Sequence, residues 1–208
     1  MTVESMEAAN LIAGIRAGDP QAFRRLYDTY ADRVMGFVLR LTGSRTETED
    51  IVQEVFVAAY ASRASFQGRS QLLTWLLGIA SRLWRDRCRQ RTPQTTTLFA
   101  EEVAEGTASH DAAVLFSPRS LETDVINALT LADALARLEP LFREALLLVA
   151  SQGLTYREAA EIMDEPIGTV KWRVAQATRR MSRLLDAVEE ECNAMQQSSS
   201  ADICSCRQ

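Results

Sequence analysis

Residues 154–180, LTYREAAEIMDEPIGTVKWRVAQATRR, contain two short helical patterns separated by a break. Thr155 and Glu158 have the spacing of a capping box, which marks the start of a helix. Asp164 tolerates the left-handed conformation that ends a helix, and Pro166 suits the first turn of the next one. This stretch therefore predicts a helix–turn–helix.

The second helix of this pair is basic, although the whole chain has a formal net charge of −5. Val170 and Val174 supply its inner face, and the small Ala160 lets the two helices approach closely. Long donors at the start of such a helix can reach base edges in a major groove. Its outer face carries Lys171, Trp172, Arg173, Gln176 and Arg179. A solvated bundle helix and a membrane-surface helix are the competing interpretations, and the pattern favours nucleic-acid binding.

Apolar residues recur at helical spacing along most of the chain and predict an all-α fold. Residues 92–124 lack this spacing and mix Thr, Ser, Pro and Gly with acids, which is typical of a linker. The last residues, 192–208, look unstructured by composition. We therefore predict two small helical domains joined by a flexible acidic linker, with the helix–turn–helix in the second. The predicted parts are 1–91, the linker 92–123, the second domain 124–188 and a tail 189–208.

Charge is unevenly distributed among these predicted domains, the linker and the tail. Residues 60–91 contain seven arginines and one aspartate, and residues 171–183 contain five basic residues and no acid. The acids gather instead in residues 92–130 and in the tail. Basic patches of this kind are the electrostatic footprint of nucleic-acid contact.

Composition argues against several classes of protein. No apolar run approaches the roughly 18 residues that a membrane span needs, and the N-terminus lacks a basic signal region. We therefore expect a cytoplasmic protein without membrane insertion. His110 is the one histidine, and no coherent nucleophile, base or phosphate loop is present, so we expect no enzyme activity.

Two long segments resemble bacterial sigma factors of the extracytoplasmic-function (ECF) type. Residues 138–185, with the run G-T-V-K-x-R at 168–173, resemble the C-terminal domain of these factors, and residues 22–91 resemble the N-terminal domain. The resemblance implies a factor that binds core RNA polymerase, recognises the −10 and −35 promoter elements and directs transcription initiation. It also implies a stress or metal-response regulon and an anti-sigma factor as a further candidate partner.

The resemblance assigns a role to three groups of residues. The recognition helix would contact the −35 element through Thr169, Lys171, Trp172, Arg173, Gln176 and Arg180. The segment EDIVQEVF, 49–56, would dock a coiled coil of the largest polymerase subunit through Asp50, Gln53, Glu54 and Val57. The −10 element would be bound by Phe66, Arg69, Ser70, Trp75, Arg82, Arg85 and Arg89.

The third group also makes physical sense without the resemblance. Single-stranded DNA needs aromatic rings on which bases stack and arginines that neutralise phosphates. Phe66 and Trp75 are predicted to shape a pocket, next to a helix lined with arginines. The competing interpretation is that Trp75 and Trp84 are both core residues, and an outward position of Trp84, toward solvent or DNA, is left open.

The tail holds a C-x-C pair, Cys204 and Cys206, with Cys192 before it. Thiolates bind soft metals such as zinc or copper(I). No cofactor is required by the predicted function, and two interpretations of the tail stay open: an inert or oxidisable tail, and a metal- or redox-sensing one. A stand-alone helix–turn–helix regulator and a metal- or redox-binding helical protein are the alternatives for the whole chain.

Overall fold

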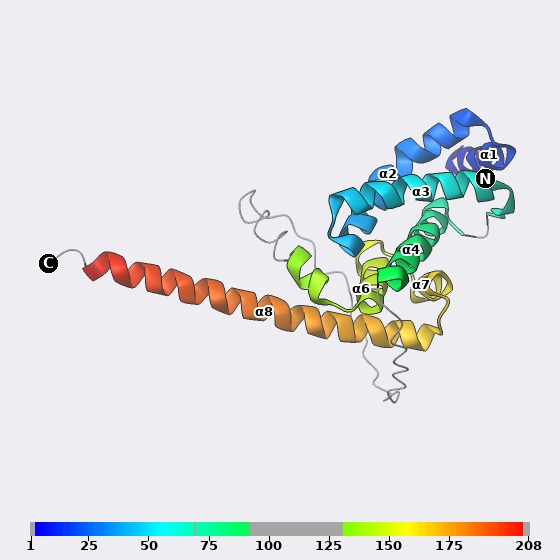
Figure 1. The fold of residues 1–208 in the computed structure, drawn as a ribbon. Helices are drawn as coiled ribbons and strands as arrows, with labels where there is room; N and C mark the ends of the chain where they lie inside the picture. Colours follow the sequence, from blue (N-terminus) through cyan, green and yellow to red (C-terminus); the bar gives the residue numbers. More distant parts are fainter. Residues whose placement is uncertain (1–2, 69, 92–130, 206–208) are drawn as a thin grey trace.

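A computed structural model describes the backbone of residues 3–68, 70–91 and 131–205, and the side chains of residues 10–68, 70–91 and 131–186. Every regular element within these ranges is helical, which confirms the all-α prediction (Figure 1). The predicted linker, 92–123, lies outside the described residues.

The N-terminal domain packs α2 (Pro20–Thr42), α3 (Arg45–Ser62) and α4 (Leu72–Arg91) against one another, with α1 (Val3–Ala17) on α2 and a short 3-10 turn, η1 (Arg63–Ser65), after α3. Its helix ends follow from local chemistry. The Asp19 side chain accepts a hydrogen bond from the Gln21 backbone N–H at the start of α2. Gly43, with a φ of 68°, ends that helix in the left-handed conformation.

The C-terminal domain consists of helical residues 131–137, α6 (Pro140–Leu146), a π-helical turn η2 (Leu147–Ser151), α7 (Tyr156–Met163) and α8 (Ile167–Ser205). The predicted helix–turn–helix is confirmed in α7 and the start of α8. The capping box between Thr155 and Glu158 is present, and Asp164 has a φ of 56° at the end of α7. Ala160 and Val170 are both buried, as the close approach of the two helices requires.

The expectation of an unstructured tail from residue 192 onward was wrong, because α8 continues to Ser205. The physical reason is that no Gly or Pro follows Gly168. Strong helix formers such as Ala, Glu, Met and Gln therefore extend the helix without a breaker. Figure 1 shows α8 passing along the C-terminal domain and then projecting well beyond it.

The two domains are packed against each other. In the described structure α4 lies against α7, and α2 lies against α6 and η2. The buried apolar residues form one continuous cluster that includes Phe37 and Leu76 from the first domain and Leu148 and Met163 from the second. The faces that carry the predicted binding residues are therefore held in a defined arrangement.

Candidate nucleic-acid interface

The start of α8 presents two of its predicted DNA contacts to solvent. Lys171 is exposed, and its Nζ lies 5.8 Å from the centroid of the Tyr156 ring. Trp172 is 37% exposed, and its ring packs at a tilt against that of Phe142, with centroids 5.4 Å apart. Thr169 and Gln176 are partly buried on the same helix. A lysine and a large aromatic ring therefore face outward where a recognition helix would meet base edges.

The two predicted arginines of this helix are held by acids. The side chain of Arg173 is only 14% exposed and forms an ion pair with Glu165 at 2.7 Å. Arg180 donates to Glu139 at 3.0 Å, and its guanidinium lies 4.5 Å from the centroid of the Phe142 ring. Arg173 thus braces the turn between α7 and α8, whereas Arg180 is 43% exposed and reaches the surface.

The four residues predicted to bind polymerase form one exposed stripe on α3. Their spacing of three, four and seven residues places Asp50, Gln53, Glu54 and Val57 on one helix face, and all four are exposed. Val57 is 70% exposed, so the stripe presents one large aliphatic side chain beside its polar ones. Glu54 receives a hydrogen bond from Arg87 of α4 at 2.7 Å, which orients its carboxylate.

Sequence reasoning missed two tyrosines beside this stripe. Tyr60 of α3 is 45% exposed and packs edge-on against Phe23, while Tyr27 of α2 is 50% exposed and packs against Phe56. Tyrosine is enriched in protein interfaces because it offers a large rigid surface at low entropic cost. Their helical spacing fits a core stripe equally well, so no sequence signal separated them from the core.

The loop before α4 forms the predicted aromatic pocket. Phe66 and Trp75 stack with centroids 4.6 Å apart and planes 29° from parallel. Together with Ser65, Gln67 and Ser70 they line an open hollow of about 290 Å³. Phe66 is buried and Trp75 is half-buried. Arg69 lies outside the described residues. An unstacked base could rest against this aromatic surface.

The three arginines of α4 that were predicted to bind DNA do not share one environment. Arg82 and Arg89 are exposed, and Arg89 pairs with Asp86 one turn away. Arg85 points toward the C-terminal domain, and its side chain is 21% exposed. Trp84, on the same helix, is buried in the core.

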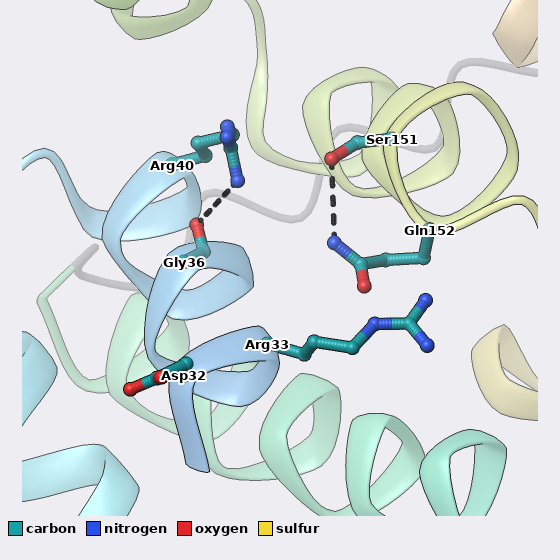
Figure 2. Close-up of a pocket in the computed structure, with 6 residues that line it drawn as sticks. All are labelled: Asp32, Arg33, Gly36, Arg40, Ser151 and Gln152. Carbon is teal, nitrogen blue, oxygen red and sulfur yellow. Dashed lines mark hydrogen bonds between the residues drawn. The ribbon is translucent and has the colours of Figure 1, made fainter. Parts of the chain in front are cut away.

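A second hollow, of about 340 Å³, lies between the two domains (Figure 2). Asp32, Arg33, Gly36 and Arg40 of α2 line one side, and Ser151 and Gln152 line the other. Figure 2 shows the Arg33 side chain extending toward Gln152 across the opening. No sequence motif marks this hollow, because it exists only where the two domains meet.

The described residues contain no group of three or more His, Cys, Asp or Glu side chains arranged to hold a metal ion. The side chains of Cys192, Cys204 and Cys206 lie outside the described part. Cys88 is half-buried on α4, and burial is the main cause that raises the pKa of its thiol.

In the described ranges, no helix is long and apolar enough to cross a membrane.

Comparison with known families matches both domains. Residues 26–94 match sigma-70 region 2, and residues 128–181 match sigma-70 region 4. The chain therefore belongs to the sigma-70 family of RNA polymerase sigma factors, in its ECF group. Such factors bind core RNA polymerase and promoter DNA, direct promoter recognition and are not enzymes.

Its relatives match over most of their length. The RNA polymerase sigma-H factor of Pseudomonas aeruginosa is 30% identical over 87% of this chain and 95% of its own. The ECF sigma factor SigW of Bacillus subtilis is 30% identical over 84% of this chain and 94% of its own. The sigma factor RpoE of Bartonella quintana, solved in complex with the anti-sigma factor NepR, is 28% identical with a TM-score of 0.59, over 79% of this chain and 96% of its own.

Proposed function

We propose that this chain reads a −35 element with the start of α8 and a −10 element with the hollow at Phe66 and Trp75 and the exposed arginines of α4. Core polymerase would be bound through the α3 stripe of Asp50, Gln53, Glu54 and Val57. The observation that carries this proposal is that one sigma-70 framework holds the exposed Lys171 and Trp172 at the start of α8, the open hollow beside the exposed arginines of α4, and the exposed α3 stripe.

The proposal extends to the cellular setting. A sigma factor acts where RNA polymerase acts, so we place the chain in the cytoplasm. We also propose an anti-sigma factor as a partner, supported by the relative from Bartonella quintana that was solved with one. The regulon we propose is one of stress or metal response.

The decisive experiment is run-off transcription with the full chain and purified core polymerase over a library of promoters. We expect initiation that depends on both proteins. A chain that binds duplex DNA tightly alone and directs no initiation with any promoter would instead be a stand-alone regulator, and the proposal would be lost.

Charge reversal on the α3 stripe tests polymerase binding separately. Asp50→Arg should weaken binding to core polymerase at least about tenfold, because a like charge facing the basic partner costs several kcal/mol. Binding is measured by fluorescence anisotropy of the labelled chain against core polymerase. Asp133→Arg reverses an exposed acid of the other domain and should leave the affinity unchanged. If Asp50→Arg and Asp133→Arg bind core polymerase with equal affinity, the α3 stripe is not part of the polymerase-binding surface.

We further propose that the tail cysteines bind zinc or copper(I), and the support is their chemistry. Cys204 and Cys206 supply the two closely spaced thiolates of a C-x-C pair, and Cys192 supplies a third. The double variant Cys204→Ser, Cys206→Ser should bind zinc more than about 100-fold more weakly, since losing even an outer-shell partner costs about 10- to 100-fold. Competition with a chromophoric chelator measures this affinity, with Cys88→Ser as the control. If the double variant binds zinc as tightly as the wild type, the tail cysteines are not zinc ligands, and the interpretation of an inert or oxidisable tail is favoured.

A further inference from the structure

The exposed face at the start of α8 is partly apolar. Among the described residues of the C-terminal domain, the large hydrophobic side chains that are exposed belong to Leu141 of α6 and to Ile167 and Trp172 of α8. Because α8 begins at Ile167, two of these three lie in its first two turns. Contacts between a recognition helix and base edges are made from this end of the helix.

The polar side chains beside Trp172 are engaged to different degrees. Arg173 is paired with Glu165 at 2.7 Å and is only 14% exposed, so the arginine that could read a guanine is occupied. Gln176 is partly buried. Lys171 is exposed and carries a flexible point charge, which suits a phosphate better than a planar base edge. The Trp172 ring is therefore the large rigid group that this part of the described helix turns outward.

Aromatic packing fixes the ring of Trp172. It lies against Phe142 of α6 at 57° between ring planes, with centroids 5.4 Å apart. The Arg180 guanidinium lies 4.5 Å from the centroid of Phe142 and is itself held by Glu139 at 3.0 Å. A ring that is fixed before binding loses little conformational freedom when a base contacts it, so little affinity is spent on ordering it.

Gly168 leaves the surface one turn before Trp172 bare. The two residues are four positions apart and therefore share a face of α8. Gly168 is exposed, and a Cβ built on it would meet no atom within 4 Å. It is not among the glycines with a positive φ, so its backbone does not require glycine. Neither backbone nor packing explains a glycine here, whereas close approach of a ligand to the helix does.

These features match one chemical group of the DNA major groove. The groove displays hydrogen-bond donors, acceptors and one apolar group, the C5-methyl of thymine. An apolar ring gains free energy by burying that methyl group, whereas covering a donor or acceptor without a hydrogen bond costs free energy. The indole N–H of Trp172 is one donor on an otherwise apolar ring. The bare surface at Gly168 gives a base edge room to reach this ring.

We propose that Trp172 and Gly168 form an apolar contact surface for the methyl group of one thymine in the −35 element. Trp172 is then a specificity-determining residue of this chain, and Lys171 adds affinity without this choice. The inference rests on the proposed function, since it assumes that the start of α8 enters the major groove of the −35 element. It predicts that one A·T pair of that element is recognised through its methyl group.

Replacement of thymine by deoxyuridine tests the proposal, because the two bases differ only in that methyl group. The −35 element is selected from the promoter library with the wild-type chain and core polymerase, and each thymine of either strand is then replaced in turn. Fluorescence anisotropy of the holoenzyme on these promoters gives the affinities. At one position deoxyuridine should weaken binding by the wild type about fourfold, the value of one buried methyl group, and binding by Trp172→Ala less than about 1.5-fold.

Two further variants separate lost discrimination from lost affinity. Lys171→Ala, the matched control from the same helical turn, should weaken binding to thymine and deoxyuridine promoters alike and leave their ratio unchanged. Trp172→Phe should keep part of the ratio, because it keeps an apolar ring. An equal cost of deoxyuridine in the wild type and in Trp172→Ala, or no cost at any position, would overturn the inference. An indole N–H that donates to a phosphate would give the first of these results.

Gly168→Ala supplies a second measurement that leaves the packing of Trp172 intact. Its Cβ meets no atom within 4 Å and alanine favours a helix, so urea unfolding should show a stability equal to or above that of the wild type. Affinity for the promoter should fall at least about fivefold, since one methyl group forced into a close contact costs that much or more. Unchanged promoter affinity would contradict the contact surface.

The outcomes separate the inference from the function on which it rests. If the wild type initiates from promoters of the library but no thymine depends on Trp172, the sigma factor role stands and the thymine contact is lost. If no promoter supports initiation, the proposed function fails and the thymine contact fails with it.

Discussion

Reversing two exposed charges of the recognition helix, Lys171→Glu with Arg179→Glu, should reduce transcription from a promoter that depends on its −35 element by at least about 30-fold. Each lost contact to a base or phosphate costs about 1–3 kcal/mol, and the new carboxylates repel the DNA in addition. Both side chains are exposed on α8, so the substitution removes little of the packing between α6, α7 and α8.

The measurement has two parts. Run-off transcription gives the loss of activity, and fluorescence anisotropy of the holoenzyme on promoter DNA at several salt concentrations gives the number of ionic contacts. The slope of log affinity against log salt should become shallower by about two, since each phosphate neutralised contributes roughly 0.9. A smaller change in slope with a large loss of activity would indicate base contacts rather than phosphate contacts.

A control with the same change in net charge distinguishes specific contact from general electrostatics. Arg16→Glu with Arg45→Glu reverses two exposed arginines of the N-terminal domain. This control should retain most of the activity of the wild type. Equal losses in the two double variants would show that the start of α8 has no special role in promoter recognition.

The second large effect is a pH dependence of stability that Glu144 controls. Burial raises the pKa of Glu144 from 4.5 to about 7, and the opposing influence of the Arg85 guanidinium and the Ser81 hydroxyl is too weak to cancel it. Arg85 and Cys88 face it from α4, Glu165 from the turn after α7, and Arg173 from α8. In the unfolded chain the carboxyl group returns to an ordinary pKa.

The direction in which stability changes with pH follows from the difference in proton binding between the folded and unfolded chain. Between pH 4.5 and 7 the folded protein holds a proton on Glu144 that the unfolded chain has lost, so the free energy of unfolding falls as pH rises through this window. The contribution is fully present below pH 4.5 and is lost by about pH 7, a change of about 3 kcal/mol. Below pH 4.5 and above pH 7 this residue adds no further slope.

Urea unfolding of the wild type and of Glu144→Gln at a series of pH values measures this effect. The amide imitates the protonated carboxyl group, so the variant should lack the part of the slope between pH 4.5 and 7 that Glu144 causes. Glu49→Gln, at an exposed position paired with Arg45, should keep the slope of the wild type. If Glu144→Gln follows the wild-type curve, Glu144 is ionised in the folded protein throughout.

Much of the fold could be read from local chemistry. The capping box at Thr155, the left-handed Asp164 and the proline at 166 act within a few residues of one another, so their outcome did not depend on the rest of the chain. The same holds for the stripe from Asp50 to Val57, whose spacing alone places it on one face. The prediction of an unstructured tail rested on polar composition alone and was wrong. The lack of Gly and Pro after Gly168 decided the outcome, and α8 continues to Ser205.

The sequence by itself thus determined an all-helical chain with a helix–turn–helix, an acidic stripe and an aromatic pocket, because each depends on neighbours within one or two helical turns. Only the tertiary structure decided which arginines are available. Arg85 and Arg82 are alike in sequence, three positions apart on one helix. The packing of α4 against α7 turns Arg85 to helix-end carbonyls and a buried carboxylate and leaves Arg82 in solvent. A contact between residues nearly 80 positions apart depends on how two domains dock, and no local pattern records that.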